Sequence, residues 1–193
     1  MTDIMNLITS QLGSGAVQQL SQNIGADENA TQKAITAAVP LLLSALARNA
    51  SSPGGAESLY TAVSRDHDGS ALDNVMNLVG NTSSGNGAGI LNHVLGSQQP
   101  AVQQGLAKST GLDAGTIAQI LQVAAPLVLG ALGRTQQQQG FDAGGLSQFL
   151  GTQQQQAQAQ QPDLMGTLGR LLDSNHDGNM MDDVGNVLGK FLK

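Results

Sequence analysis

Oxygen-bearing side chains alternate along one short stretch in the second half of the sequence. Residues 173–179 read DSNHDGN, which places Asp173, Asn175, Asp177 and Asn179 at positions 1, 3, 5 and 7, with Gly178 at position 6. EF-hand loops share this pattern, because alternate residues of a tight loop converge on one point and Ca²⁺ takes about six to eight oxygen ligands. The spacing therefore predicts calcium binding, with position 7 contributing its carbonyl oxygen.

The end of this loop departs from the EF-hand pattern. Position 12, where that pattern has a bidentate Glu, is Val184, and the acids Asp182 and Asp183 come earlier. The loop would therefore have to close early. Asp182 is the stronger candidate because Asp73 occupies the matching position in a related stretch, whereas Asn74 matches Asp183, and both acids remain candidate ligands.

The related stretch is a weaker loop in the first half of the sequence. Its candidate oxygen ligands are Ser64, Asp66, Asp68, Ser70 and Asp73. A serine stands at position 1 and Arg65 follows it, so we expect a lower affinity for calcium or no metal binding. The alternative for both loops is an Asx-Gly turn that caps the following helix, with Asp73 or Asp182 near the helix N-terminus.

Both loops belong to a longer internal repeat. Residues 34–48 (AITAAVPLLLSALAR) align with residues 120–134 (ILQVAAPLVLGALGR) at an offset of 86, with seven identities in fifteen positions. Residues 66–80 align with residues 175–189, again with seven identities in fifteen, at an offset of 109. Self-similarity over such long segments predicts two copies of one structural unit.

The offset grows from 86 to 109 because the second copy carries an insertion. Residues 135–161 contain twelve Gln, with Gly and Ala between them, and few apolar side chains that could offset the entropy cost of ordering. We expect a flexible surface excursion, interrupted by a short helix at residues 146–150. The predicted organisation is a first helical repeat over residues 1–86 and a second over residues 87–193, with the Gln-rich insertion at about 135–161.

The elements that must position the loops are helices. Apolar residues recur at helical spacing, as in Ile4, Leu7, Ile8 and Leu12, and no convincing alternation of period two occurs. Pro40 and Pro126 lie at matching points inside apolar segments, so each kinks its helix or separates two shorter helices. The predicted fold class is all-α, a duplicated helical repeat with kinked apolar helices and EF-hand-like loops.

Four charged residues flank the repeated apolar segments. Asp27 and Asp113 precede them and are predicted to cap the helices or to interact with the helix dipoles. Arg48 and Arg134 follow at the C-terminal ends, where we expect each guanidinium to cap exposed carbonyls.

Composition argues against several classes of partner. The formal charge is −6 and the eight Lys and Arg are scattered, so the sequence has no basic stripe for nucleic acid. The longest apolar stretches are shorter than the roughly 20 residues that a membrane span needs, which favours buried helices. Aromatic residues make up 2%, so deep aromatic-lined ligand pockets are not expected.

Catalytic motifs are absent from the sequence. There is no cysteine, no nucleophile elbow, no phosphate-binding glycine loop and no H-E-x-x-H helix. His67 and His176 fall between candidate ligand positions and are predicted to be exposed, and His93 has no second His or Cys at metal spacing. We therefore predict that the chain is not an enzyme.

The repeated A-x-P-L-x-L-x-A-L segment and the run L-L-D-x-N-x-D-G-x-x-x-D-D resemble the YidB-like bacterial family, a domain of unknown function. Residues 124–134 and 171–183 carry the most specific part of this resemblance. It implies a bacterial origin and a helical fold, and brings no established activity or site residues.

These observations predict a non-enzymatic, calcium-binding helical protein in which the metal has a structural or regulatory role. The alternative is a metal-independent helical interaction or self-assembly module, with a homo-oligomer or another protein as partner. No signal peptide is visible, so the default compartment is the cytoplasm, with non-classical export left open.

Overall fold

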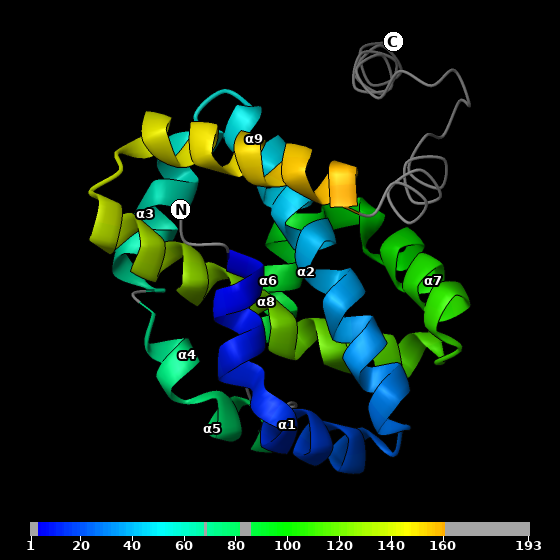
Figure 1. The fold of residues 1–193 in the computed structure, drawn as a ribbon. Coiled ribbons are helices and arrows are strands. Elements are labelled where there is room, and N and C mark those ends of the chain that lie inside the picture. Colours follow the sequence, from blue (N-terminus) through cyan, green and yellow to red (C-terminus); the bar gives the residue numbers. More distant parts are fainter. Residues whose placement is uncertain (1–3, 68, 82–85, 161–193) are drawn as a thin grey trace, which may run out of the picture.

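Helices make up the part of the chain that the computed structural model describes, which is residues 4–67, 69–81 and 86–160 (Figure 1). The elements in chain order are α1 (Ile4–Ile24), α2 (Glu28–Ser51), α3 (Gly55–Arg65), α4 (Ser70–Asp73), α5 (Val75–Gly80), α6 (Gly87–Leu95), the 3₁₀ turn η1 (Gly96–Gln98), α7 (Gln99–Thr110), α8 (Ala114–Gln139) and α9 (Ala143–Gln160). No strand occurs in these residues, so the all-α prediction is confirmed for them.

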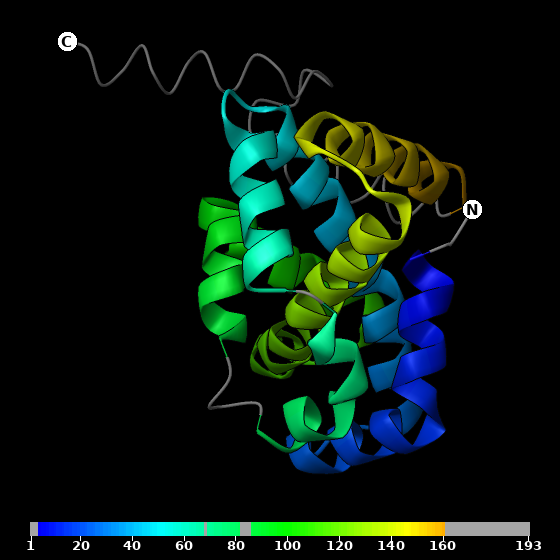
Figure 2. The ribbon, with the colours of Figure 1, turned by 90° about the vertical axis from the view of Figure 1, so that its left-hand side faces the viewer.

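The two long apolar helices, α2 and α8, pack against each other and supply much of the core. Figures 1 and 2 show α3 and α9 toward one end of the bundle and α5 toward the opposite end. α2 and α8 contact helices at both ends, including α3, α4, α6 and α7. Both helices carry apolar side chains on nearly all sides of their central segments. Such a helix must lie in the middle of the bundle, because only there can neighbouring helices cover it on several sides.

Both core helices are longer than the apolar stretches within them. With 24 and 26 residues, α2 and α8 each have the length and the apolar composition to cross a membrane, which corrects the expectation that no segment is long enough. In each helix, however, 72% of the apolar window is buried inside the bundle. Their hydrophobic surface is thus already covered by the chain itself, as in the core of a helical bundle.

The two core helices begin with the same cap. The Asp27 carboxylate accepts a hydrogen bond from the Ala30 backbone N–H at 2.9 Å, and the Asp113 carboxylate accepts one from Thr116 N–H at 3.0 Å. Each bond satisfies an N–H that has no partner inside its helix. The capping prediction is therefore confirmed for both aspartates.

Proline does not divide either core helix. Pro40 lies inside α2 and Pro126 inside α8, and each helix continues for more than two turns beyond its proline. The prediction of two shorter helices at these points is wrong. Both prolines are buried, so the packing that surrounds them holds the helix together despite the missing backbone donor.

The Gln-rich insertion is helical and packed, which corrects the prediction of a flexible excursion. Its first residues extend α8, and α9 then lies against α2 and α3. Leu146 and Leu150 are 1% and 0% exposed, and the rings of Phe141 and Phe149 are 5.4 Å apart. A few large apolar side chains at helical spacing are therefore enough to order a segment in which Gln predominates.

Candidate functional site

The first Asp-Gly loop lies directly on the side of α8. It connects α3 with α4, and Gly69 adopts a φ of 101°, in the left-handed region that glycine tolerates. A Cβ on Gly133 would lie 1.8 Å from the His67 carbonyl oxygen, and a Cβ on Gly130 would lie 3.2 Å from the Ala71 Cβ. The absence of side chains on these two α8 glycines is what lets the loop backbone approach the helix.

Arg134 of α8 holds this loop through two contacts. One guanidinium nitrogen, Nη2, donates to the Gly69 carbonyl oxygen at 3.3 Å and lies 2.7 Å from Asp73 Oδ1. The Arg134 side chain is 26% exposed and that of Asp73 is 63% exposed, so the pair is partly screened by solvent. The prediction that Arg134 caps its own helix is wrong, because α8 continues to Gln139 and the guanidinium binds a different element.

The other predicted ligands of the first loop lie along α3 and α4. Ser64 is on α3, and its Oγ is buried without a hydrogen-bond partner. Asp66 is exposed at the C-terminal end of α3, and Ser70 begins α4. Asp68 lies outside the described residues, and within them no three His, Asp or Glu side chains form a group that could hold a metal ion. Calcium binding at this loop stays a prediction.

The second and stronger predicted loop lies outside the described residues. This applies to Asp173, Asn175, Asp177, Asn179, Asp182 and Asp183, and to His176. Calcium binding there rests on the sequence pattern alone and also stays a prediction.

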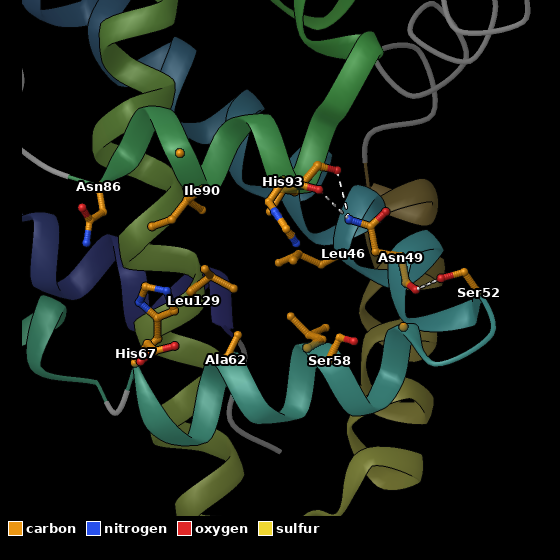
Figure 3. A pocket seen from close by; sticks show the side chains of 15 residues that line it. Leu46, Asn49, Ser52, Ser58, Ala62, His67, Asn86, Ile90, His93 and Leu129 are labelled. Carbon is orange, nitrogen blue, oxygen red and sulfur yellow. Dashed lines mark hydrogen bonds between the residues drawn. The ribbon is translucent and has the colours of Figure 1, made fainter.

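A cleft that was not predicted opens between α3 and α6, with α2 and α8 behind it (Figure 3). Its volume is about 890 Å³. His67 and His93 both line it, although no pattern in the sequence places them on one cavity. Leu46 and Leu129 are among its apolar lining residues. None of the lining residues in the described part of the chain is Phe, Tyr or Trp.

The residues from α1 to the end of the apolar part of α8 match a known family model. The model describes a bacterial protein of unknown function, DUF937, and it matches residues 6–135. The chain belongs to the DUF937 family. No curated protein and no solved structure matches the sequence or fold of this chain.

The DUF937 match separates the features of this chain into two groups. The Arg134–Asp73 contact, α2, most of α8 and the whole α3–α6 cleft lie inside residues 6–135. The packed helix α9 and the predicted loop at residues 173–183 lie outside them. The sequence resemblance is therefore confirmed over both repeated apolar segments, residues 34–48 and 120–134, while its C-terminal run at residues 171–183 falls beyond the family match.

Arg48 of this DUF937 chain, which aligns with Arg134 in the internal repeat, has different surroundings. It lies in the last turn of α2, and its guanidinium donates to the side-chain oxygen of Gln98 in η1. Burial lowers the pKa of Arg48, because a desolvated cation is less stable than a hydrated one. Among the described residues no carboxylate forms an ion pair with it. The two aligned arginines therefore share a position in sequence and bind different partners.

Proposed function

We propose that this chain is a non-enzymatic helical protein that binds calcium through the loop at residues 173–183, where the metal has a structural or regulatory role. The observation that supports the proposal is the contact of Arg134 with the first loop. There a single cationic group meets both the Gly69 carbonyl oxygen and the Asp73 carboxylate. A loop of this sequence thus presents two kinds of oxygen to a cation, as calcium loops do.

The second loop has a greater requirement for a cation than the first. Residues 64–74 contain three Asp and one Arg, whereas residues 173–183 contain four Asp and no basic residue. Asp173 stands where the first loop has Ser64, and Ser174 stands where it has Arg65. The additional repulsion among carboxylates favours a bound divalent ion at the second loop.

A thermal melt of the full chain tests this proposal. The protein is melted in excess chelator, in millimolar Ca²⁺ and in millimolar Mg²⁺. An ion that binds the folded state alone stabilises it by about 2.7 kcal/mol at a hundredfold excess over Kd. We expect a rise in Tm that is specific for Ca²⁺, and we expect Asp177→Ala to abolish it.

The matched control is Asp68→Ala, which makes the same change at the same position of the first loop. It should leave the calcium-dependent rise in place. If calcium gives no rise in Tm and a direct titration shows no binding, the calcium proposal is wrong. If both variants lose the rise equally, the metal does not act through the second loop specifically.

The second candidate is a metal-independent interaction or self-assembly module. It is favoured by the Arg134 guanidinium, which supplies the cation at the first loop, so that this loop is held on α8 without a metal ion. Size-exclusion chromatography coupled to light scattering, with and without chelator, separates the two candidates. An oligomer whose mass is the same in both conditions supports this second function.

A further inference from the structure

The α3–α6 cleft has the chemistry of a binding site for a small molecule. Its volume of about 890 Å³ falls in the range of about 300–1,000 Å³ that small-molecule sites occupy. It lies within the DUF937 match, and neither Arg134 nor Asp73 is among its lining residues. None of its described lining residues belongs to the loop at residues 173–183, so a ligand in this cleft would be a function separate from the proposed calcium binding.

The charge of the lining favours a cation. Asp66 is the one formally charged side chain among the lining residues that the structure describes, and neither Lys nor Arg is among them. The whole chain carries a formal charge of −6. An organic anion would find no permanent positive charge here, whereas an ammonium group would find a carboxylate.

The middle of the cleft is aliphatic. Figure 3 shows Leu46, Ala62, Ile90 and Leu129 between the polar residues at its two ends. Aliphatic side chains bury methylene groups well, and each buried CH₂ contributes about 0.8 kcal/mol. Because no Phe, Tyr or Trp lines the described cleft, its stacking surface is limited to the imidazole rings of His67 and His93.

Polar groups stand at both ends of this aliphatic section. His67 and Asn86 lie at one end, and Asn49, Ser58 and His93 lie toward the other (Figure 3). Asp66 also lines the cleft and directly precedes His67 in the chain. The Asn49 Nδ2 donates to the Val94 carbonyl oxygen at 3.1 Å and to that of His93 at 3.4 Å. The group that Asn49 offers to a ligand is therefore its side-chain oxygen, an acceptor suited to N–H donors.

We propose that the cleft binds a linear aliphatic diamine. One ammonium group pairs with the Asp66 carboxylate, the methylene chain lies along Leu46, Ile90 and Leu129, and the second amine donates to Asn49 and Ser58. The observation that selects this class is the combination of one carboxylate, two polar ends and an aliphatic middle in a single cavity.

Isothermal titration of the full chain in chelator tests the proposal with three probes of equal length. The probes are 1,8-diaminooctane, 1,8-octanediol and octanedioic acid, which share an eight-carbon chain and carry positive, neutral and negative end groups at pH 7. Binding should be strongest for the diamine. Asp66→Asn should weaken diamine binding by about three- to fivefold, the effect of losing one partly exposed ion pair.

Glu57→Gln is the matched control, because it removes one negative charge from the same helix at an exposed position that does not line the cleft. It should leave diamine affinity unchanged. Ala62→Phe, which fills the middle of the cleft, should abolish binding, and its circular dichroism spectrum and melt verify that the chain still folds. The proposal is overturned if the two charge variants weaken binding equally, if octanedioic acid binds better than the diamine, or if no probe binds at millimolar concentration.

Discussion

Arg134 and Asp73 are 61 positions apart in the sequence, and their side chains meet at 2.7 Å in the folded chain. The same guanidinium nitrogen also donates to Gly69, so one residue of α8 holds both the turn and the short helix that comes after it. An arginine suits this task because it presents several donors from one planar group.

Removing this pair should have a small, salt-dependent effect on stability. A double-mutant cycle with Asp73→Asn and Arg134→Gln should give a coupling free energy of about 0.5–1 kcal/mol, because both side chains are partly exposed. The measurement is urea unfolding at low salt and in 1 M NaCl, where the coupling should fall. Arg65→Gln is the control, since Arg65 is exposed. A coupling near zero at low salt would mean that the ion pair does not stabilise the loop.

Two glycines on long helices should respond in opposite ways to alanine. At Gly133 the new Cβ would meet the His67 carbonyl oxygen, so Gly133→Ala should destabilise the fold by about 1–3 kcal/mol or more. At Gly151 on α9 nothing lies within 4 Å, and the higher helix propensity of alanine should stabilise the fold by about 0.5–1 kcal/mol. Urea unfolding of the two variants measures both effects. Equal changes in the free energy of unfolding for the two variants would show that the loop backbone does not pack closely against α8 at Gly133.

The cap of α8 should make stability depend on pH at the acidic end. Hydrogen bonds from the Thr116 side chain and backbone N–H lower the pKa of Asp113 below its ordinary value of 3.8. A lowered folded-state pKa means that the cap stabilises fully above the unfolded-state pKa and loses its effect as the pH falls through the folded-state pKa. The Tm of Asp113→Ala should therefore lie below that of the unmodified chain at pH 7, and the two should converge as the pH falls through the folded-state pKa of Asp113.

Asp113→Asn serves as the matched control for this experiment. Asparagine caps a helix but does not titrate, so the difference in Tm between Asp113→Asn and Asp113→Ala should not change with pH in this range. A difference between Asp113→Ala and the unmodified chain that is constant from pH 7 to pH 2 would contradict the assigned role of the carboxylate.

Packing of α9 can be tested at its most buried side chain. Leu150 is 0% exposed, so Leu150→Ala should cost about 2–5 kcal/mol through the lost burial and the cavity that remains. Met76→Ala, at a side chain that is 54% exposed, should change stability by less than about 0.5 kcal/mol. Chemical unfolding measures both. If Leu150→Ala is as mild as Met76→Ala, the Gln-rich segment does not contribute to the folding core.

Local patterns in the sequence were sufficient to predict the core helices and the residues at which they begin. The caps at Asp27 and Asp113 could be predicted because a capping carboxylate binds backbone within its own turn. The apolar segments around Pro40 and Pro126 predicted the buried helices, since burial follows from side chains that water solvates poorly. The connection between α3 and α4 could be located for the same reason, because Asp and Gly favour turns through their own short-range geometry, whereas most of the predicted loop at residues 64–74 is helical.

The partners of these elements were decided by the tertiary structure. Arg134 reads as a helix cap from sequence, yet it binds Asp73 because folding brings α4 onto α8. The composition of the Gln-rich segment predicts a flexible excursion, yet Leu146 and Leu150 are buried against the rest of the bundle. His67 and His93 read as unrelated, yet they line one cleft. Each of these depends on contacts between residues far apart in the chain, and the periodicity of a single segment carries no information about which other segment will cover it.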